Sequence, residues 1–190
     1  VLFFYVIKYK NRFLISMQFI REGVLSKPVA IDYVEGPNYL SLLDKDGKCH
    51  LFYVGYDKEQ MNLYHRVLKD DFSTFGLPEK IFSAKQNIRS LSGVCTGSNK
   101  IHIAFEVFSD DFCNIMYKNL SEDAKPASLY EGKTVPGHSG LVYNNGVIYL
   151  FRMLNGNIYF RSSENNGTAW FNDELYPLGS NVILFSYITN

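Results

Sequence analysis

Short apolar segments recur along the chain, and each is followed by a polar turn and a second segment in which apolar and polar residues alternate. The apolar segments begin at residues 2, 50, 102 and 149, so their starts are 48, 52 and 47 residues apart. The segments after the turns begin at residues 12, 62, 114 and 157, and three of them share an Asn, Ile or Leu, Tyr theme. Alternation over such lengths predicts β-strands, and the regular spacing predicts one structural unit that is used four times.

A further strand-like segment precedes three of the four repeats, and a looser segment follows each of them. The leading segments are 39–43, 89–94 and 139–143, and the trailing ones lie near 28–31, 80–82, 128–130 and 175–177. Asp46-Gly47 and Asn145-Gly146 stand between a leading segment and the next strand. Both dipeptides favour tight hairpins because their residues accept a positive φ. We therefore expect four antiparallel strands in each repeat.

Antiparallel units of four strands and about 40–50 residues are typical of the blades of a β-propeller. The sequence thus predicts an all-β fold, a single β-propeller domain of about four blades. The first repeat lacks a leading strand, and we expect the C-terminal strand in 181–190 to supply it, because closing the ring removes exposed sheet edges. An incomplete arc of a larger propeller is the alternative. The expected repeats are 181–190 with 1–34, then 35–85, 86–135 and 136–180.

The composition narrows the classes of partner. Hydrophobic residues make up 46% of the chain and aromatic residues 16%, as expected for a globular protein rich in sheet. The formal net charge is zero, so no global positive field attracts a nucleic acid or an anionic membrane. No apolar run reaches about 18 residues, the length needed for a membrane span. The three cysteines form no paired motif, and no sequence motif indicates a metal or another cofactor.

Residues 157–170 carry the most specific motif, Ser163-x-Asn165-x-Gly167-x-x-Trp170. It resembles the Asp-box of the bacterial-neuraminidase-repeat (BNR), sialidase-like β-propellers, whose pattern is Ser-x-Asp-x-Gly-x-x-Trp. Asn165 stands where that family has Asp. The resemblance implies a propeller fold, a structural turn remote from the catalytic face, and an extracellular or surface location.

Loops that would gather on one face of such a propeller carry the candidate ligand-binding residues. Amide and hydroxyl groups can bond sugar hydroxyls, Tyr can stack on a sugar face, and Arg can hold a carboxylate. A polar, aromatic loop face therefore predicts a glycan or protein ligand. The candidates are Tyr39, Asn87, Arg89, His138 and Asn181.

The function expected from these observations is a non-catalytic recognition or scaffold module for carbohydrate or protein binding, either monomeric or oligomeric through paired sheet edges. The alternative is a glycoside hydrolase, sialidase-like or other, or a fragment of one. Hydrolysis of a glycosidic bond needs two carboxyl groups beside it, and spacing alone does not rank the candidates, which are Asp32, Glu35, Asp57, Glu106 and Asp110. Sialidase-like enzymes also carry an Arg-Ile-Pro signature, which this sequence lacks. We therefore assign no catalytic residue.

Overall fold

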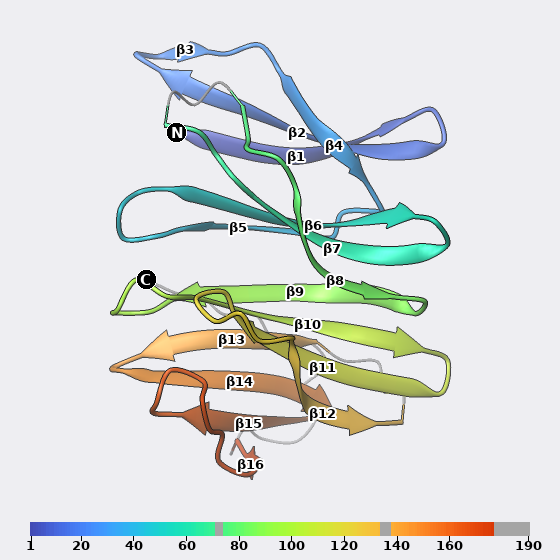
Figure 1. The fold of residues 1–190 in the computed structure, drawn as a ribbon, viewed down its shortest axis with the longest axis vertical. Coiled ribbons are helices and arrows are strands. Elements are labelled where there is room, and N and C mark those ends of the chain that lie inside the picture. The colour runs from blue at the N-terminus through green and yellow to red at the C-terminus, as the bar shows by residue number, and fades with distance from the viewer. Residues whose placement is uncertain (71–73, 134–137, 177–190) are drawn as a thin grey trace. The chain divides into compact units, whose positions relative to one another are not determined.

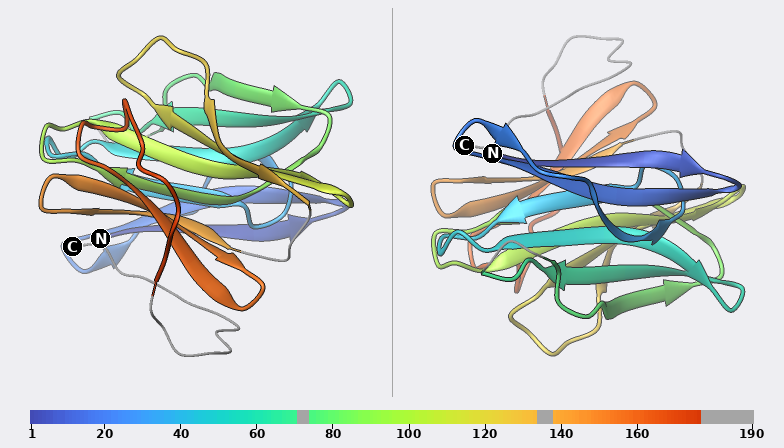
Figure 2. Two further views of the ribbon diagram at one scale, coloured as in Figure 1. Left: turned by 90° about the horizontal axis from the view of Figure 1, so that it is seen from below. Right: turned by 90° about the horizontal axis from the view of Figure 1, so that it is seen from above.

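The computed structural model of the chain describes residues 1–70, 74–133 and 138–176. The regular elements in these ranges are β-strands, grouped into four antiparallel sheets (Figure 1). The strands of each sheet twist relative to one another, as Figure 2 shows. No helix with the length and apolarity of a membrane span occurs in the part of the chain that is described.

The chain divides into two compact units, each with two of the sheets. The first unit comprises residues 1–43 and 47–85, and the second comprises residues 44–46 and 86–190. Each unit has a core of its own. Ile15, Met17, Leu51 and Tyr53 lie at the centre of the first core, and Ala104, Leu141, Ile148 and Leu150 at the centre of the second.

The first unit holds the sheets β1–β4 and β5–β8. In the first of these sheets β2 is central: β1 pairs with one edge, and β3 and β4 share the other. β3 and β4 pair with different parts of the same edge of β2, so the sheet is three strands wide. Among the described residues, β1 has no strand on its outer edge. The second sheet follows chain order. The strands are β1 (Leu2–Tyr9), β2 (Arg12–Arg21), β3 (Val24–Leu25), β4 (Val29–Val34), β5 (Tyr39–Leu43), β6 (Cys49–Asp57), β7 (Gln60–Val67) and β8 (Glu79–Ala84).

The second unit holds two sheets whose strands also follow chain order, β9 to β12 and β13 to β16 (Figure 1). Each strand pairs antiparallel with the next. The strands are β9 (Asn87–Cys95), β10 (Ile101–Ser109), β11 (Phe112–Asn119), β12 (Ala127–Gly132), β13 (Ser139–Asn144), β14 (Val147–Leu154), β15 (Asn157–Ser163) and β16 (Glu174–Leu175).

The predicted all-β fold of four antiparallel sheets is confirmed. The predicted segment 39–43 coincides with β5, and the segment 139–143 lies within β13. The hairpin predicted around Asn145 and Gly146 also forms, with φ values of 48° and 86°. The short strand β3 was not expected. The predicted closing strand in 181–190 lies outside the described residues, so closure of the ring stays a prediction.

Candidate functional site

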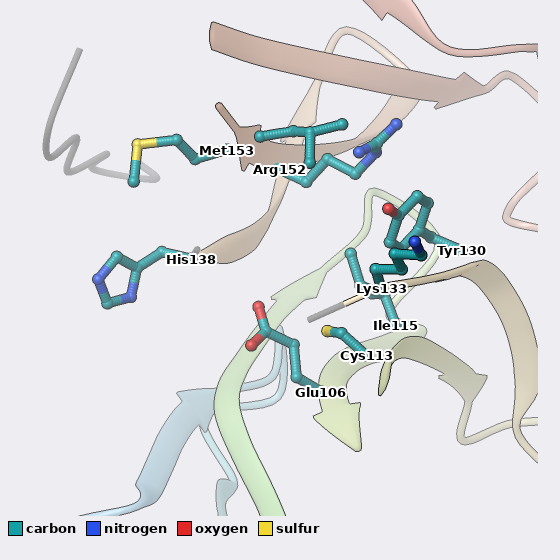
Figure 3. A pocket seen from close by; sticks show the side chains of 9 residues that line it. Glu106, Cys113, Ile115, Tyr130, Lys133, His138, Arg152 and Met153 are labelled. Atoms are coloured by element: carbon teal, nitrogen blue, oxygen red, sulfur yellow. The ribbon is translucent and has the colours of Figure 1, made fainter. Parts of the chain in front are cut away.

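A small pocket, partly open to solvent, lies in the second unit (Figure 3). Its walls come from β10, β11, β12 and the residue that follows it, the residue before β13, and the end of β14. We call it the Glu106 pocket. Its lining residues are Glu106, Cys113, Ile115, Tyr130, Lys133, His138, Arg152, Met153 and Leu154.

Glu106 is the most buried charged group of this pocket, with 3% of its surface exposed. Its carboxylate points into the space between His138 and Cys113 in Figure 3. Arg89 Nε donates a hydrogen bond to Glu106 Oε2 at 2.9 Å, and the Arg89 guanidinium lies 3.8 Å from the centre of the Phe108 ring. A buried carboxylate is costly unless it is paired, and Arg89 supplies the paired charge.

A β-bulge sets the direction of the two charged side chains. Arg89 and Glu106 are directly opposed in the β9–β10 ladder, and the register shifts between Ala104 and Glu106. On the same stretch of β9, Ser90 has a φ of 54°, which is unusual for a residue other than glycine. Bulges re-aim side chains and are frequent beside functional sites. The bulge therefore lies where Glu106 faces the pocket and meets Arg89.

Arg152 forms the opposite part of the wall from β14. It is 8% exposed, and its guanidinium lies 4.1 Å from the centre of the Tyr130 ring. Arg152 Nη2 donates to Asp173 Oδ2 at 3.0 Å, whereas Arg152 Nε has no hydrogen-bond partner among the described residues. Figure 3 shows the guanidinium directed toward Tyr130 and away from His138.

Asp173 binds two arginines and so fixes the position of Arg152. Arg161 donates to both carboxylate oxygens, from Nε at 2.9 Å and from Nη2 at 3.0 Å. Burial by itself raises the pKa of Asp173, but the hydrogen bonds from Arg161 and Arg152 outweigh it, and the pKa lies below its ordinary value. Asp173 is thus an anion that holds one edge of the pocket wall.

The thiol of Cys113 lies beside Glu106 in the wall. Burial raises the pKa of Cys113, and the negative charge of Glu106 raises it further. A thiol with a raised pKa is a poor nucleophile, because the thiolate is the reactive form. Cys113 therefore contributes an apolar surface to the pocket.

Of the predicted ligand-binding residues that the structure describes, His138 alone lines this pocket. His138 lies just before β13, whereas Arg89 does not line the pocket and contacts one of its lining residues, Glu106. Asn87 is exposed at the start of β9 and does not line it. Tyr39 lies in the first unit, where its hydroxyl donates to the carbonyl oxygen of Phe4 at 3.0 Å. Asn181 lies outside the described residues.

The turn that contains the Ser163 motif is held by its own side chains. Ser163 Oγ accepts a hydrogen bond from the amide of Gly167 at 2.9 Å and donates one to Asn165 Oδ1 at 2.9 Å. Asn165 Oδ1 also accepts a hydrogen bond from the backbone amide of Ala169 at 2.9 Å. The side-chain oxygen of Asn165 thus makes hydrogen bonds that an Asp carboxylate could also accept at this position. Trp170 packs edge-on against Tyr117, with ring centres 5.1 Å apart. None of the motif residues lines the Glu106 pocket.

From the sequence, Glu106 was named only as a candidate carboxyl group, and Arg152 was not singled out. Both were recognisable as charged residues inside otherwise apolar strands, in Ala104-Phe-Glu-Val-Phe108 and Leu150-Phe-Arg-Met153. Such a residue must be paired or functional when its strand is buried. Within the described residues, no cluster of His, Cys, Asp and Glu has the geometry of a metal site.

Comparison with known proteins gives matches in structure and none in sequence. No protein-family model matches the chain, and no curated protein matches it. The structure is similar to the NanB sialidase from Streptococcus pneumoniae, with a TM-score of 0.58 and 10% identity over 90% of this chain and 48% of the sialidase. A structure described as NanB plus Optactamide gives a TM-score of 0.59 at 9% identity, over the same shares of the two chains.

A second similar structure is a thermostable family-43 glycoside hydrolase, with a TM-score of 0.52 and 10% identity over 92% of this chain and 71% of that one. This chain spans about half the length of the two sialidase structures described above. Identities this low show the fold and nothing further about activity. Together with the four antiparallel sheets of four strands, the likeness shows that the chain has a β-propeller fold.

Proposed function

We propose that this chain is a non-catalytic recognition module that binds a saccharide in the Glu106 pocket. The observation that carries the proposal is the buried, Arg89-paired carboxylate of Glu106, which faces a space shared with His138. A carboxylate and an imidazole can bond neighbouring sugar hydroxyls, and Tyr130 adds an aromatic surface. Two proteins of the same fold are a sialidase and a glycoside hydrolase, which supports a carbohydrate as the ligand class.

The presence of a single carboxyl group among the described lining residues favours binding over hydrolysis. Hydrolysis of a glycosidic bond requires two such groups on either side of the bond, about 5 to 9.5 Å apart. Among the described residues that line the pocket, Glu106 alone carries a carboxylate. The carboxylate of Glu106 is also engaged within the protein, because it accepts a hydrogen bond from Arg89.

The finer family assignment belongs to the same proposal. We propose that the turn at Ser163–Trp170 is a structural variant of the BNR Asp-box, with Asn165 in place of Asp. Its internal hydrogen bonds and its absence from the pocket lining support a structural role. The resemblance, with a carbohydrate ligand, also favours an extracellular or surface location.

A glycan array followed by calorimetry with the best-binding glycan tests the proposal. Glu106→Gln keeps the shape of the side chain and removes its charge, so we expect the Kd to rise roughly 10- to 100-fold, as for the loss of a charged hydrogen bond. Glu131→Gln is the matched control, because Glu131 is exposed on β12 and does not line the pocket. An array without any bound glycan, or equal affinity of Glu106→Gln and the unmodified protein, contradicts the proposal.

A panel of chromogenic glycosides decides between recognition and hydrolysis. We expect no turnover above the uncatalysed rate. Turnover that is lost in Glu106→Gln and kept in Glu131→Gln would establish the glycoside hydrolase alternative instead, with Glu106 as a catalytic residue.

A further inference from the structure

The first unit contains a pocket of its own, built from the ends of three strands. It is a shallow depression open to solvent, and it is lined by Arg12, Tyr33, Val34, Glu35 and Tyr56. We call it the tyrosine pocket. Arg12 begins β2, Tyr33 and Val34 end β4, and Tyr56 lies near the end of β6. Its open shape suits a single small ring, which would lie against its surface and not be enclosed.

The two tyrosine rings of this pocket are not part of the core. Along β4 the side chains alternate: Val34 is buried and Asp32 accepts a hydrogen bond from Tyr53, so Tyr33 points to the other face of the sheet. Tyr33 is 46% exposed and Tyr56 is 58% exposed. Exposed aromatic side chains gathered around a pocket mark a binding surface more than a packing requirement.

The charges of the tyrosine pocket balance each other. Arg12 offers hydrogen-bond donors, and Glu35 offers acceptors. The Arg12 guanidinium lies 5.4 Å from the centre of the Tyr33 ring, and neither Arg12 nor Glu35 makes an ion pair with another described residue. A donor and an acceptor of opposite charge favour an uncharged ligand that carries several hydroxyl groups over an anion or a cation.

We infer that the tyrosine pocket is a second saccharide site, which takes a neutral sugar residue. Tyr33 and Tyr56 would present their faces to the C–H surfaces of the sugar ring, and Arg12 and Glu35 would bond its hydroxyls. The inference rests on the proposed saccharide function, and it adds a separate site with a separate set of residues. Two saccharide sites on one chain would raise the avidity for a polysaccharide beyond the affinity of either site.

Backbone amide shifts in NMR titrations test the inference, with methyl β-xyloside, methyl β-glucoside and methyl β-galactoside as neutral probes and N-acetylneuraminic acid as a charged one. We expect a neutral glycoside to cause saturable shifts at Tyr33, Glu35 and Tyr56. N-acetylneuraminic acid is expected to cause none there. Shifts of equal size with the charged probe would overturn the assignment to neutral sugars.

Variants separate stacking from nonspecific effects. Tyr56→Ala should raise the Kd at the tyrosine pocket roughly tenfold, and Tyr56→Phe should bind like the unmodified protein because it keeps the ring. Tyr9→Ala is the control, since Tyr9 is 48% exposed in the same unit and does not line the pocket. Unchanged thermal unfolding of Tyr56→Ala would show that a loss of affinity is local to the pocket. If Tyr56→Ala does not fold, the same titration of Tyr33→Ala replaces it.

The outcomes distinguish this site from the one proposed above. Shifts at the tyrosine pocket that persist in Glu106→Gln support an independent second site. Shifts confined to the amides around Glu106 overturn the second site and leave the proposed function intact. Shifts confined to the tyrosine pocket support the second site and contradict the assignment of the Glu106 pocket. Absence of shifts at both places, or binding at the tyrosine pocket that Tyr56→Ala and Tyr33→Ala leave unchanged, overturns the inference.

Discussion

Arg89 and Glu106 occupy directly opposed positions of β9 and β10, and their side chains meet at 2.9 Å beside a break in the register of the two strands. The Glu106 side chain is almost completely buried, whereas the Arg89 side chain keeps 29% of its surface exposed. The carboxylate has therefore lost most of its water, and the guanidinium replaces part of that hydration. Such pairs are strongly coupled, because either partner alone would be a buried or poorly solvated charge.

Replacing Arg89 by Met should therefore destabilise the protein by about 3 kcal/mol, because Glu106 is left buried without its counter-ion. The double variant Arg89→Met with Glu106→Leu should regain most of that loss, since no charge remains to be desolvated. Urea unfolding of Arg89→Met, Glu106→Leu, the double variant and the unmodified protein gives the four free energies of a double-mutant cycle. Additive losses in the double variant would show that the two side chains are not coupled.

Gly167 should be far less tolerant of substitution than Gly146, although both have a positive φ, of 81° and 86°. A Cβ at Gly146 meets no atom within 4 Å, whereas one at Gly167 would collide with the ring and hydroxyl of Tyr117. Gly146→Ala should cost about 1 kcal/mol of left-handed strain. Gly167→Ala should cost roughly 2 kcal/mol or more, because it adds a displacement of Tyr117. Thermal unfolding of both variants measures the difference, and equal losses would contradict the packing role of Gly167.

His102 should make the protein lose stability in mild acid. It is completely buried, and its Nδ1 lies 2.5 Å from the hydroxyl oxygen of Tyr117. Burial, and to a lesser degree the charge of Lys100, lowers the pKa of His102 to about 4. In the unfolded chain this histidine has an ordinary pKa of about 6.5, so the unfolded chain binds the proton at a higher pH than the folded protein does. The folded state is therefore not penalised by His102 above that pH, and its stability falls as the pH drops toward 4. The loss attributable to His102 is roughly 3 kcal/mol.

Unfolding free energies at several pH values between 4 and 7, for the unmodified protein and His102→Asn, test this prediction. The variant should show a flatter pH dependence. Part of the slope should remain, because the pKa of His65 is also lowered, chiefly by burial. Identical pH profiles for the two proteins would show that His102 is not responsible.

Deleting residues 181–190 should lower the thermal stability and promote self-association, if this segment supplies the missing strand of the first blade as the sequence predicts. The reason is that β1 pairs with β2 on one side and has an open edge among the described residues, and open edges recruit other strands. Sedimentation and thermal unfolding of the truncated and complete chains test it. Unchanged stability and unchanged mass after truncation would favour the incomplete-arc alternative.

The sequence determined the strands and their grouping. Residues 39–43 and 144–146 carry local signals, alternation and an Asn-Gly turn, and the structure has β5 and a tight turn with positive φ at those positions. Such signals depend on neighbours in the chain, so they can be recognised in a single sequence. The motif at Ser163 is of the same kind, because its hydrogen bonds join residues within four positions of one another.

The tertiary structure alone decided which charged residues form a site. Glu106 joins Arg89 through a bulge that shifts the β9–β10 register, and His138 and Arg152 reach the same pocket from another sheet. Tyr33 and Tyr56, separated by 23 positions in the numbering, line one pocket because β4 and β6 end close together. Local alternation indicates the face of a strand on which a side chain lies. It does not indicate what faces that side chain from another strand, because that depends on long-range register and packing.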